Sequence, residues 1–132
     1  MGITLRHRLA RSLAVLLLLL AFAAGCTGRR NAPVDAAKAR EVLRTALDSW
    51  KKGDKADALQ SASPPIYVID PEWQGGAVLK DYQIVDDGKE MDAHLFSSVK
   101  LTLRGSGGQE VKREVTYIIS TAPNLTVSRK VF

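Results

Sequence analysis

The order of apolar and polar residues predicts a helix in the first half of the chain. Between residues 35 and 52, apolar side chains recur every three or four positions, which places them on one face of a helix. They are Ala39, Val42, Leu43, Ala46, Leu47 and Trp50. Asp35 can cap the N-terminus of this helix, and Gly53 can end it because glycine readily adopts the left-handed conformation. A second, short helix is predicted from Lys55 to Gln60, with Asp54 as its cap.

Strand patterns follow after a linker. Ser61–Gly76 contains three prolines, which prevent a continuous helix, and its apolar residues Ile66, Val68 and Ile69 must pack somewhere. The predicted strands are Val78–Val85, His94–Arg104, Val111–Thr121 and Leu125–Phe132. In the second strand, Leu95, Val99, Leu101 and Leu103 alternate with Lys100, Thr102 and Arg104. One face of the sheet is therefore predicted to be buried and the other exposed to solvent, which favours antiparallel hairpins.

These elements predict an α+β fold. One long N-terminal amphipathic helix, together with a short second helix, packs on a curved four-stranded antiparallel sheet. Trp50 ends the apolar stripe of the long helix and is predicted to lie in the core. Trp73 lies in a loop rich in proline and glycine, where it either anchors a contact with a partner or plugs the open end of the sheet.

A separate apolar run lies near the N-terminus. Leu13–Ala24 is an unbroken run of twelve apolar residues that follows Arg6, Arg8 and Arg11. Twelve residues fall short of the roughly 20 that cross a bilayer, and they match the apolar region of a signal peptide. Small residues then lead to Cys26, the only cysteine, so an internal disulfide is excluded.

The segment Ala23-Ala24-Gly25-Cys26 resembles the lipobox of bacterial lipoproteins, with Ala23 where leucine is usual. The resemblance implies cleavage between Gly25 and Cys26 and attachment of acyl chains, including a diacylglycerol thioether, to Cys26. Membrane lipid would then be a partner, and the chain would lie in the bacterial cell envelope, facing the periplasm or the exterior. Ordinary secretion and a short uncleaved anchor are the alternatives.

The predicted organisation is a signal peptide (1–25), a polar tether (26–34) and a single domain (35–132). The net charge of +5 includes three basic residues of the leader and none of the 14 acids, so the mature chain carries about +2. This near balance predicts no nucleic-acid partner.

The stretch Leu47–Leu59, with Trp50 and the pair Gly53-Asp54, resembles the first helix-turn-helix of the nuclear-transport-factor-2-like superfamily. The whole order of elements is also similar to the cystatin-like fold. The resemblance implies a curved sheet that wraps a long N-terminal helix and encloses a cone-shaped pocket. The proline-rich residues 61–77 depart from the superfamily, which has a third helix there.

Enzymes of that superfamily use an Asp or His together with a Tyr for proton transfer, and the resemblance offers Asp81, Tyr82, His94 and Tyr117 for this role. Tyr117 shares a face with Val115 and Ile119, so we expect it in the core. Asp81 and Tyr82 are expected to point to opposite faces of their strand, which argues against an acid–base pair.

The remaining chemistry in the sequence is weak. His94 follows Asp86, Asp87, Glu90 and Asp92, but the spacing is not that of a calcium loop, and a solvated acidic turn is expected. A catalytic triad of His94 with Ser97 or Ser98 has no nucleophile-elbow pattern to support it. No catalytic residue, metal or cofactor is therefore predicted.

The first functional hypothesis is a membrane-tethered, extracytoplasmic binding or protein-interaction module with no evident catalytic site, whose partner is an envelope protein. Its candidate contact residues are Trp73, Tyr82 and His94. The alternative is a small-ligand-binding or weakly catalytic domain with a pocket between helix and sheet, and a third reading is a structural envelope component. A filled interior would favour the first hypothesis, and a polar cavity with Asp, His or Tyr would favour the second.

Overall fold

The computed structural model describes residues 32–132. The predicted leader, the cleavage site at Gly25 and Cys26, and most of the tether lie outside this range. The elements are α2 (Ala36–Lys52), a 3-10 helix η2 (Ala56–Ser61), β1 (Ile66–Ile69), α3 (Pro71–Gln74), β2 (Val78–Ile84), β3 (Lys89–Met91), β4 (His94–Arg104), β5 (Glu110–Ser120) and β6 (Leu125–Arg129). Within residues 32–132, no helix has the length and apolar character needed to cross a membrane.

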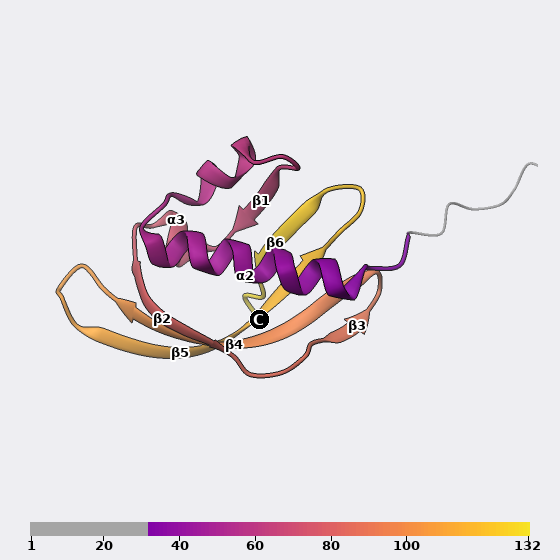
Figure 1. Ribbon diagram of the computed structural model, residues 1–132. Coiled ribbons are helices and arrows are strands. Elements are labelled where there is room, and N and C mark those ends of the chain that lie inside the picture. Colours follow the sequence, from indigo (N-terminus) through magenta and orange to yellow (C-terminus); the bar gives the residue numbers. More distant parts are fainter. Residues whose placement is uncertain (1–31) are drawn as a thin grey trace, which may run out of the picture. The chain divides into compact units, whose positions relative to one another are not determined.

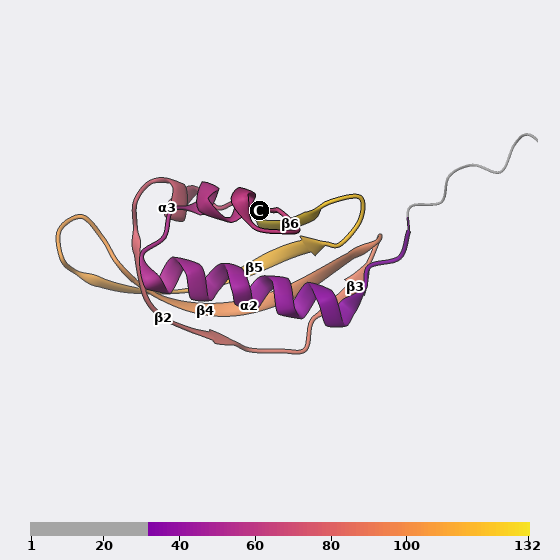
Figure 2. The ribbon, with the colours of Figure 1, turned by 45° about the horizontal axis from the view of Figure 1, so that its top comes forward.

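The N-terminal helix packs inside a curled, half-barrel sheet, so the predicted α+β class and the long helix are confirmed (Figures 1 and 2). Both caps of α2 are those predicted. The Asp35 Oδ1 atom accepts a hydrogen bond from the backbone N–H of Lys38 at 3.0 Å. Gly53 adopts φ 94°, and its N–H donates to the Trp50 carbonyl at 2.9 Å. A side chain with a Cβ is strained in that left-handed conformation, which explains the glycine.

The prediction of a purely antiparallel, four-stranded sheet was wrong. The sheet is mixed, with the strand order β1-β6-β5-β4-β2 and β3 beside β4. The four predicted strands form β2, β4, β5 and β6, and the added strand β1 comes from the predicted linker. β1 runs parallel to β6, with Ile66 opposite Leu125 and Val68 opposite Val127.

Two physical reasons account for β1. Its alternate residues Ile66 and Val68 are buried, so this apolar segment gains core contacts as a strand. A parallel pair also needs a long connection between its strands. The alternating pattern predicts only antiparallel hairpins between consecutive strands, so it could not indicate this pair. The turn after β1 is also helical: Asp70 caps α3 by accepting from the N–H groups of Glu72 and Trp73 at 3.0 and 3.3 Å.

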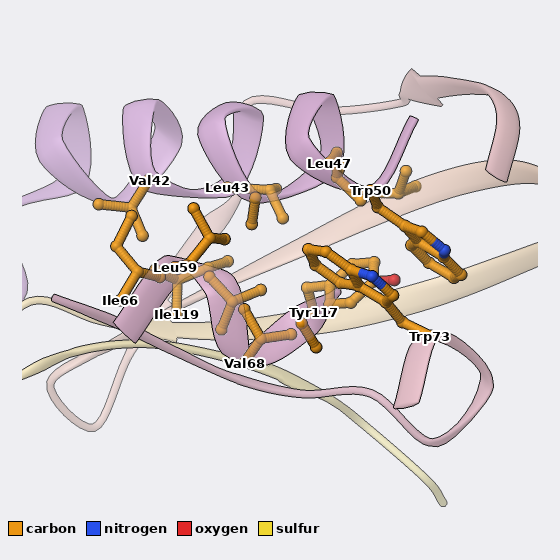
Figure 3. Close-up of a cluster of buried hydrophobic side chains, with 14 of the residues drawn as sticks. Val42, Leu43, Leu47, Trp50, Leu59, Ile66, Val68, Trp73, Tyr117 and Ile119 are labelled. Atoms are coloured by element: carbon orange, nitrogen blue, oxygen red, sulfur yellow. The ribbon is translucent and has the colours of Figure 1, made fainter. Parts of the chain in front are cut away.

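The space between α2 and the sheet is filled by apolar side chains (Figure 3). The predicted inward residues of β4 are at most 2 % exposed: Leu95, Val99, Leu101 and Leu103. Residues of α2 meet them and also meet Ile66, Val68 and Ile119, which line the same core. The interior is therefore packed, as expected for a single core.

The chain enters this fold at one end of the sheet. The N–H of Asp35 donates to Thr121 Oγ1 at 3.0 Å, which places the start of α2 beside the β5–β6 turn. We call this the entry end. The 17 residues of α2 rise by about 25 Å, so Gly53 and its neighbours lie at the opposite end, which we call the far end.

Candidate functional site

Two tryptophans close the core at the far end. Trp50 of α2 and Trp73 of α3 are stacked, with ring centroids 5.2 Å apart and planes 6° apart. Both indole N–H groups are satisfied internally, since Trp50 donates to the Ala77 carbonyl and Trp73 to the Asp54 carbonyl, each at 2.8 Å. Trp50 lies in the core as predicted, and Trp73, only 6 % exposed, takes the plugging position that the sequence left open.

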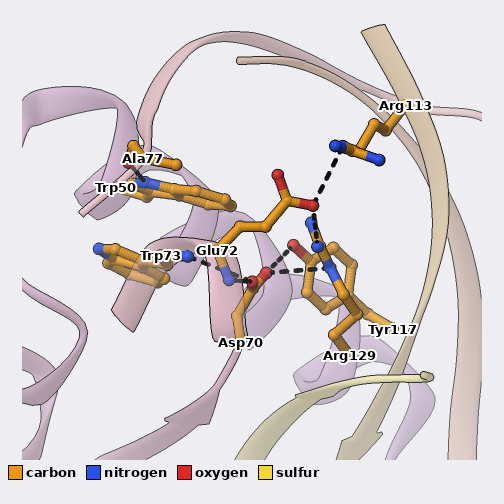
Figure 4. A network of polar contacts seen from close by, with 8 residues as sticks. All are labelled: Trp50, Asp70, Glu72, Trp73, Ala77, Arg113, Tyr117 and Arg129. Atoms are coloured by element: carbon orange, nitrogen blue, oxygen red, sulfur yellow. Dashed lines mark hydrogen bonds and ion pairs between the residues drawn. The ribbon is translucent and has the colours of Figure 1, made fainter. Parts of the chain in front are cut away.

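A buried polar network lies beside the tryptophan pair (Figure 4). Asp70 is completely buried, and its Oδ2 atom accepts a 2.6 Å hydrogen bond from the Tyr117 hydroxyl. The Nε atom of Arg129 lies 3.4 Å from the same oxygen, and Arg129 also contacts Glu72. Glu72 in turn lies 3.2 Å from Arg113 Nε. Two carboxylates thus face two guanidinium groups and tie α3 to β5 and β6.

The charges and the burial of this network raise the pKa values of Tyr117 and Arg129. Burial, followed by the charge of Asp70, raises the pKa of the Tyr117 phenol. Burial alone would lower the pKa of Arg129, but the hydrogen bond to Glu72 and the charge of Asp70 outweigh it, so that pKa is raised. Tyr117 therefore keeps its proton, and the proton is engaged at Asp70. The network is suited to holding the fold together and unsuited to proton transfer with a ligand.

The two proton-transfer candidates of β2 are also engaged, and both bond residues of α2. Tyr82 faces α2, and its hydroxyl donates to Asp48 Oδ1 at 2.6 Å. Burial and this carboxylate raise the Tyr82 pKa to about 12. Asp81 pairs with Lys51 at 3.2 Å, and this hydrogen bond lowers the Asp81 pKa.

His94 starts β4 at the entry end and is half-buried. Its Nδ1 atom donates to the Asp92 carbonyl at 2.6 Å, within the β3–β4 turn. Trp73, Tyr82 and His94 therefore lie on three different parts of the domain, and the structure does not bring them together. Among residues 32–132, no group of three or more His, Cys, Asp or Glu side chains is arranged to hold a metal ion.

An open groove of about 440 Å³ lies at the far end, against the tryptophan pair. We call it the far-end groove, and its walls come from the turn after α2, from η2 and from the α3–β2 turn. It is lined by Trp50, Gly53, Asp54, Lys55, Ala56, Asp57, Gln60, Trp73, Gln74, Gly76, Ala77 and Val78. Its polar walls carry carboxylate, ammonium and amide groups, and Val78, which is 48 % exposed, adds an apolar surface. Such a surface can bind a polar ligand or a peptide segment through hydrogen bonds.

Sequence reasoning missed both the network and the groove. Asp70, Glu72 and Arg129 were not singled out, because no local pattern links residues 57 positions apart. The groove had one signal, namely that the glycine-bearing turns Gly53-Asp54 and Gly75-Gly76 flank the two tryptophans.

The chain was compared with protein families, curated proteins and solved structures. No protein-family model matches the chain, and neither the curated proteins nor the solved structures contain a significant match.

Proposed function

We propose that this chain is a membrane-tethered binding module of the bacterial cell envelope, facing the periplasm or the exterior, with no catalytic site of its own. The sequence supports the tether. A basic segment, an apolar run of signal-peptide length and small residues lead to Cys26, which would carry the acyl chains. Residues 27–34 would then connect the anchor to the domain.

The fold supports a finer resemblance to cystatin-like and nuclear-transport-factor-2-like domains. A curled sheet wraps a long N-terminal helix, as the resemblance implies. The chain departs from the superfamily where β1 and the single turn of α3 replace its third helix.

The filled interior is the observation that favours binding over catalysis. The position between helix and sheet, where the resembled enzymes have a pocket, is occupied by Val42, Leu43 and Leu47 packed against the strands. The proton-transfer candidates do not line the far-end groove: Tyr117 is bonded to Asp70, and Tyr82 is bonded to Asp48 of α2. The groove therefore offers recognition without an acid–base pair, and we propose that it receives a segment of an envelope protein.

A small ligand is the second candidate for the same groove. The groove volume of about 440 Å³ lies within the range of roughly 300–1,000 Å³ that is typical of small-molecule sites. The lining amides Gln60 and Gln74 would then orient the ligand through hydrogen bonds.

Affinity purification of the full-length protein from detergent-solubilised membranes tests this proposal. The test variant is Asp57→Lys with Gln74→Lys, which changes two exposed residues of the far-end groove. The matched control is Glu114→Lys with Gln83→Lys, which makes the same kind of change on the exposed face of β5 and β2. We expect a protein partner that co-purifies with the wild type and with the control, and that is lost from the groove variant.

Mass spectrometry of the Cys26 peptide in the same preparation tests the tether. Acylated Cys26 is expected, and an unmodified Cys26 would contradict the proposed location. A partner that binds both variants equally would exclude the groove as its site. A lipidated protein that comes out alone would favour the small ligand over the protein segment.

A further inference from the structure

The convex face of the sheet, opposite α2, is uncovered within residues 32–132 (Figures 1 and 2). Its residues can be assigned from the strand registers, because alternate residues of a strand share a face. Near the entry end this face is formed by Tyr67, Ile69, Met91, His94, Phe96, Ser98, Thr116, Ile118, Ser120, Thr126 and Ser128. We call this set the uncharged half-face. Two lysines lie on the same face at its rim, Lys89 in β3 and Lys130 after β6.

The rest of the convex face has the opposite character. Toward the far end it is formed by Gln83, Lys100, Thr102, Arg104, Glu110, Lys112 and Glu114. Charges of both signs alternate there, as on an ordinary solvated surface. The boundary falls across the middle of β4 and β5, so the two halves of one continuous sheet face differ in chemistry.

An apolar band crosses the uncharged half-face. Ile69 lies beside Ser128, Ser128 beside Ile118, and Ile118 beside Phe96. The outer members remain accessible: Ile69 is 57 % exposed, Met91 45 % and Tyr67 40 %. Ser128 interrupts this row, and Ile118 and Phe96 between the two edge strands are half-buried. Exposed apolar side chains gathered on an uncovered sheet face are typical of a contact with a partner or a membrane.

The size and shape of the patch argue against a second copy of this chain. Five strands spaced about 4.8 Å apart and three rows of residues cover on the order of 400 Å². A stable protein interface buries about 800 Å² on each partner. Two convex faces also touch over a smaller area than two complementary surfaces.

The position of the patch points to the membrane. Ser120 of the patch precedes Thr121, which binds the N–H of Asp35 at the point where the chain enters the domain. The eight residues from Thr27 to Val34 reach about 25 Å when extended, so a lipid anchor on Cys26 keeps the entry end within that distance of the bilayer.

Charges of both signs lie at the rim of the patch. Lys89 lies beside Phe96, and the N–H of Lys130 bonds the carbonyl of Thr116 at the other rim. Both lysines are exposed, and no acidic side chain lies on the uncharged half-face itself. Acidic residues border the same patch, since Glu90 and Asp92 flank Met91 and Asp86 Oδ1 accepts a hydrogen bond from the Ser98 N–H at 3.3 Å. The apolar side chains, rather than the net charge of the rim, therefore carry the contact.

We propose that the uncharged half-face rests on the lipid surface, as a second and non-covalent contact beside the acylated Cys26. This inference depends on the lipid anchor of the proposed function. It orients the domain, because the convex face then lies toward the bilayer and α2, on the opposite side of the sheet, lies away from it. The far-end groove is not part of this face, so it remains open to partners in the aqueous compartment.

Fluorescence quenching in vesicles tests the contact. The full-length protein is reconstituted in vesicles of phosphatidylethanolamine and phosphatidylglycerol, and a single added cysteine carries an environment-sensitive fluorophore. Acylated Cys26 cannot react with the dye, so only the new thiol is labelled. The probe sites are Ile69→Cys and Met91→Cys on the uncharged half-face, with Thr102→Cys on the charged half as the control.

We expect blue-shifted emission and several-fold stronger quenching by spin-labelled lipids at both test sites than at the control site. Adding Ile69→Asp to the Met91→Cys protein should reduce the quenching at that site. Equal quenching at all three sites, with Cys26 acylated, would overturn the lipid contact and leave the anchor intact. An unmodified Cys26 would overturn both.

Two further outcomes would replace the lipid by a protein. A blue-shifted emission of the Ile69→Cys probe that disappears as the protein is diluted in lipid would assign the patch to a second copy of the chain. A blue shift that is found in native membranes but is absent from the pure lipid vesicles would assign the patch to an envelope protein. Either result would overturn the membrane contact.

Discussion

At the residue scale, Asp70 joins more of the structure than any position singled out from the sequence. Its carboxylate caps α3, accepts the Tyr117 hydroxyl and pairs with Arg129, all without exposure to solvent. A buried charge is costly unless it is paired and hydrogen-bonded, and Asp70 meets both conditions. The same argument makes Arg129 dependent on Asp70, since its Nε and Nη2 atoms are buried without a hydrogen-bond partner and the ion pair with Asp70 compensates the charge.

We expect Asp70→Ala to destabilise the domain by about 3–5 kcal/mol, because it leaves the Arg129 guanidinium with one partner fewer in the interior. Urea unfolding followed by tryptophan fluorescence measures this loss. The control is Asp57→Ala, at an exposed position of η2, with an expected change within about 0.5 kcal/mol. Similar unfolding midpoints for the two variants would show that the network contributes little to stability.

The free energy of unfolding should also depend on alkaline pH. The pKa of Tyr82 is raised from 10 to about 12 in the folded state, and that of Tyr117 is raised as well. Their contribution is fully present below pH 10, where both phenols are protonated in either state, and it is lost as the pH rises through the folded pKa. Unfolding experiments in urea between pH 9 and pH 12 should show this fall, and the Tyr117→Phe variant should show a smaller one. Complete ionisation of all phenols near pH 10 in the folded protein would contradict the buried network.

At the scale of elements, α2 and β1 show two ways in which a segment finds its place. The stripe of α2 is visible in the sequence because the helical period sorts apolar residues onto one side. β1 has only four residues, and its place depends on β6, which lies more than 50 residues later in the chain. A short apolar run has no period that distinguishes a strand from a loop with a hydrophobic contact.

Leu43→Asp should unfold the domain, because Leu43 is 1 % exposed and the substitution buries an unpaired charge under the sheet. Circular dichroism should show the loss of both helix and sheet. Thr45→Asp on the exposed side of α2 keeps the same helix length and introduces the same charge, so it serves as the control. A folded Leu43→Asp protein would mean that the buried face of α2 is assigned wrongly.

Adjacent residues of β1 should differ in their contribution to stability. Ile66→Ala removes buried methyl groups and should cost about 2–4 kcal/mol, whereas Tyr67→Ala changes a side chain on the convex face and should cost less than about 1 kcal/mol. The urea midpoints of the two variants measure the difference. Equal small costs would indicate that residues 66–69 are a linker without a structural role.

At the scale of the whole molecule, the two ends of the domain carry different surfaces. The entry end carries the chain toward Cys26 and holds the uncharged half-face, and the far end holds the groove beside the tryptophans. About 25 Å of helix separates them, so a contact through the convex face near the entry end leaves the groove accessible.

Metabolic labelling with palmitate tests the anchor on which this arrangement depends. We expect label in the wild-type protein and its loss in Cys26→Ser, because a hydroxyl cannot form the thioether. Thr27→Ser is the control, since it changes the next residue and leaves the thiol. Label that persists in Cys26→Ser would place the acyl chain elsewhere in the protein.

The sequence by itself determined the features that depend on residues close together in the chain. The helical stripe of α2, its Asp35 and Gly53 caps, the alternation of β4 and the core position of Trp50 all follow from residues within a few positions of one another. Periodicity and capping act over one or two turns, so they can be read without knowing the fold.

The tertiary structure alone decided the parallel β1–β6 pair, the union of Asp70 with Tyr117 and Arg129, and the groove between the turns of the far end. Each joins segments far apart in the chain, such as Asp70 and Tyr117, which are 47 positions apart. No local pattern encodes such pairings, because burial and charge pairing select a partner from the whole chain once the sheet has curled around its helix.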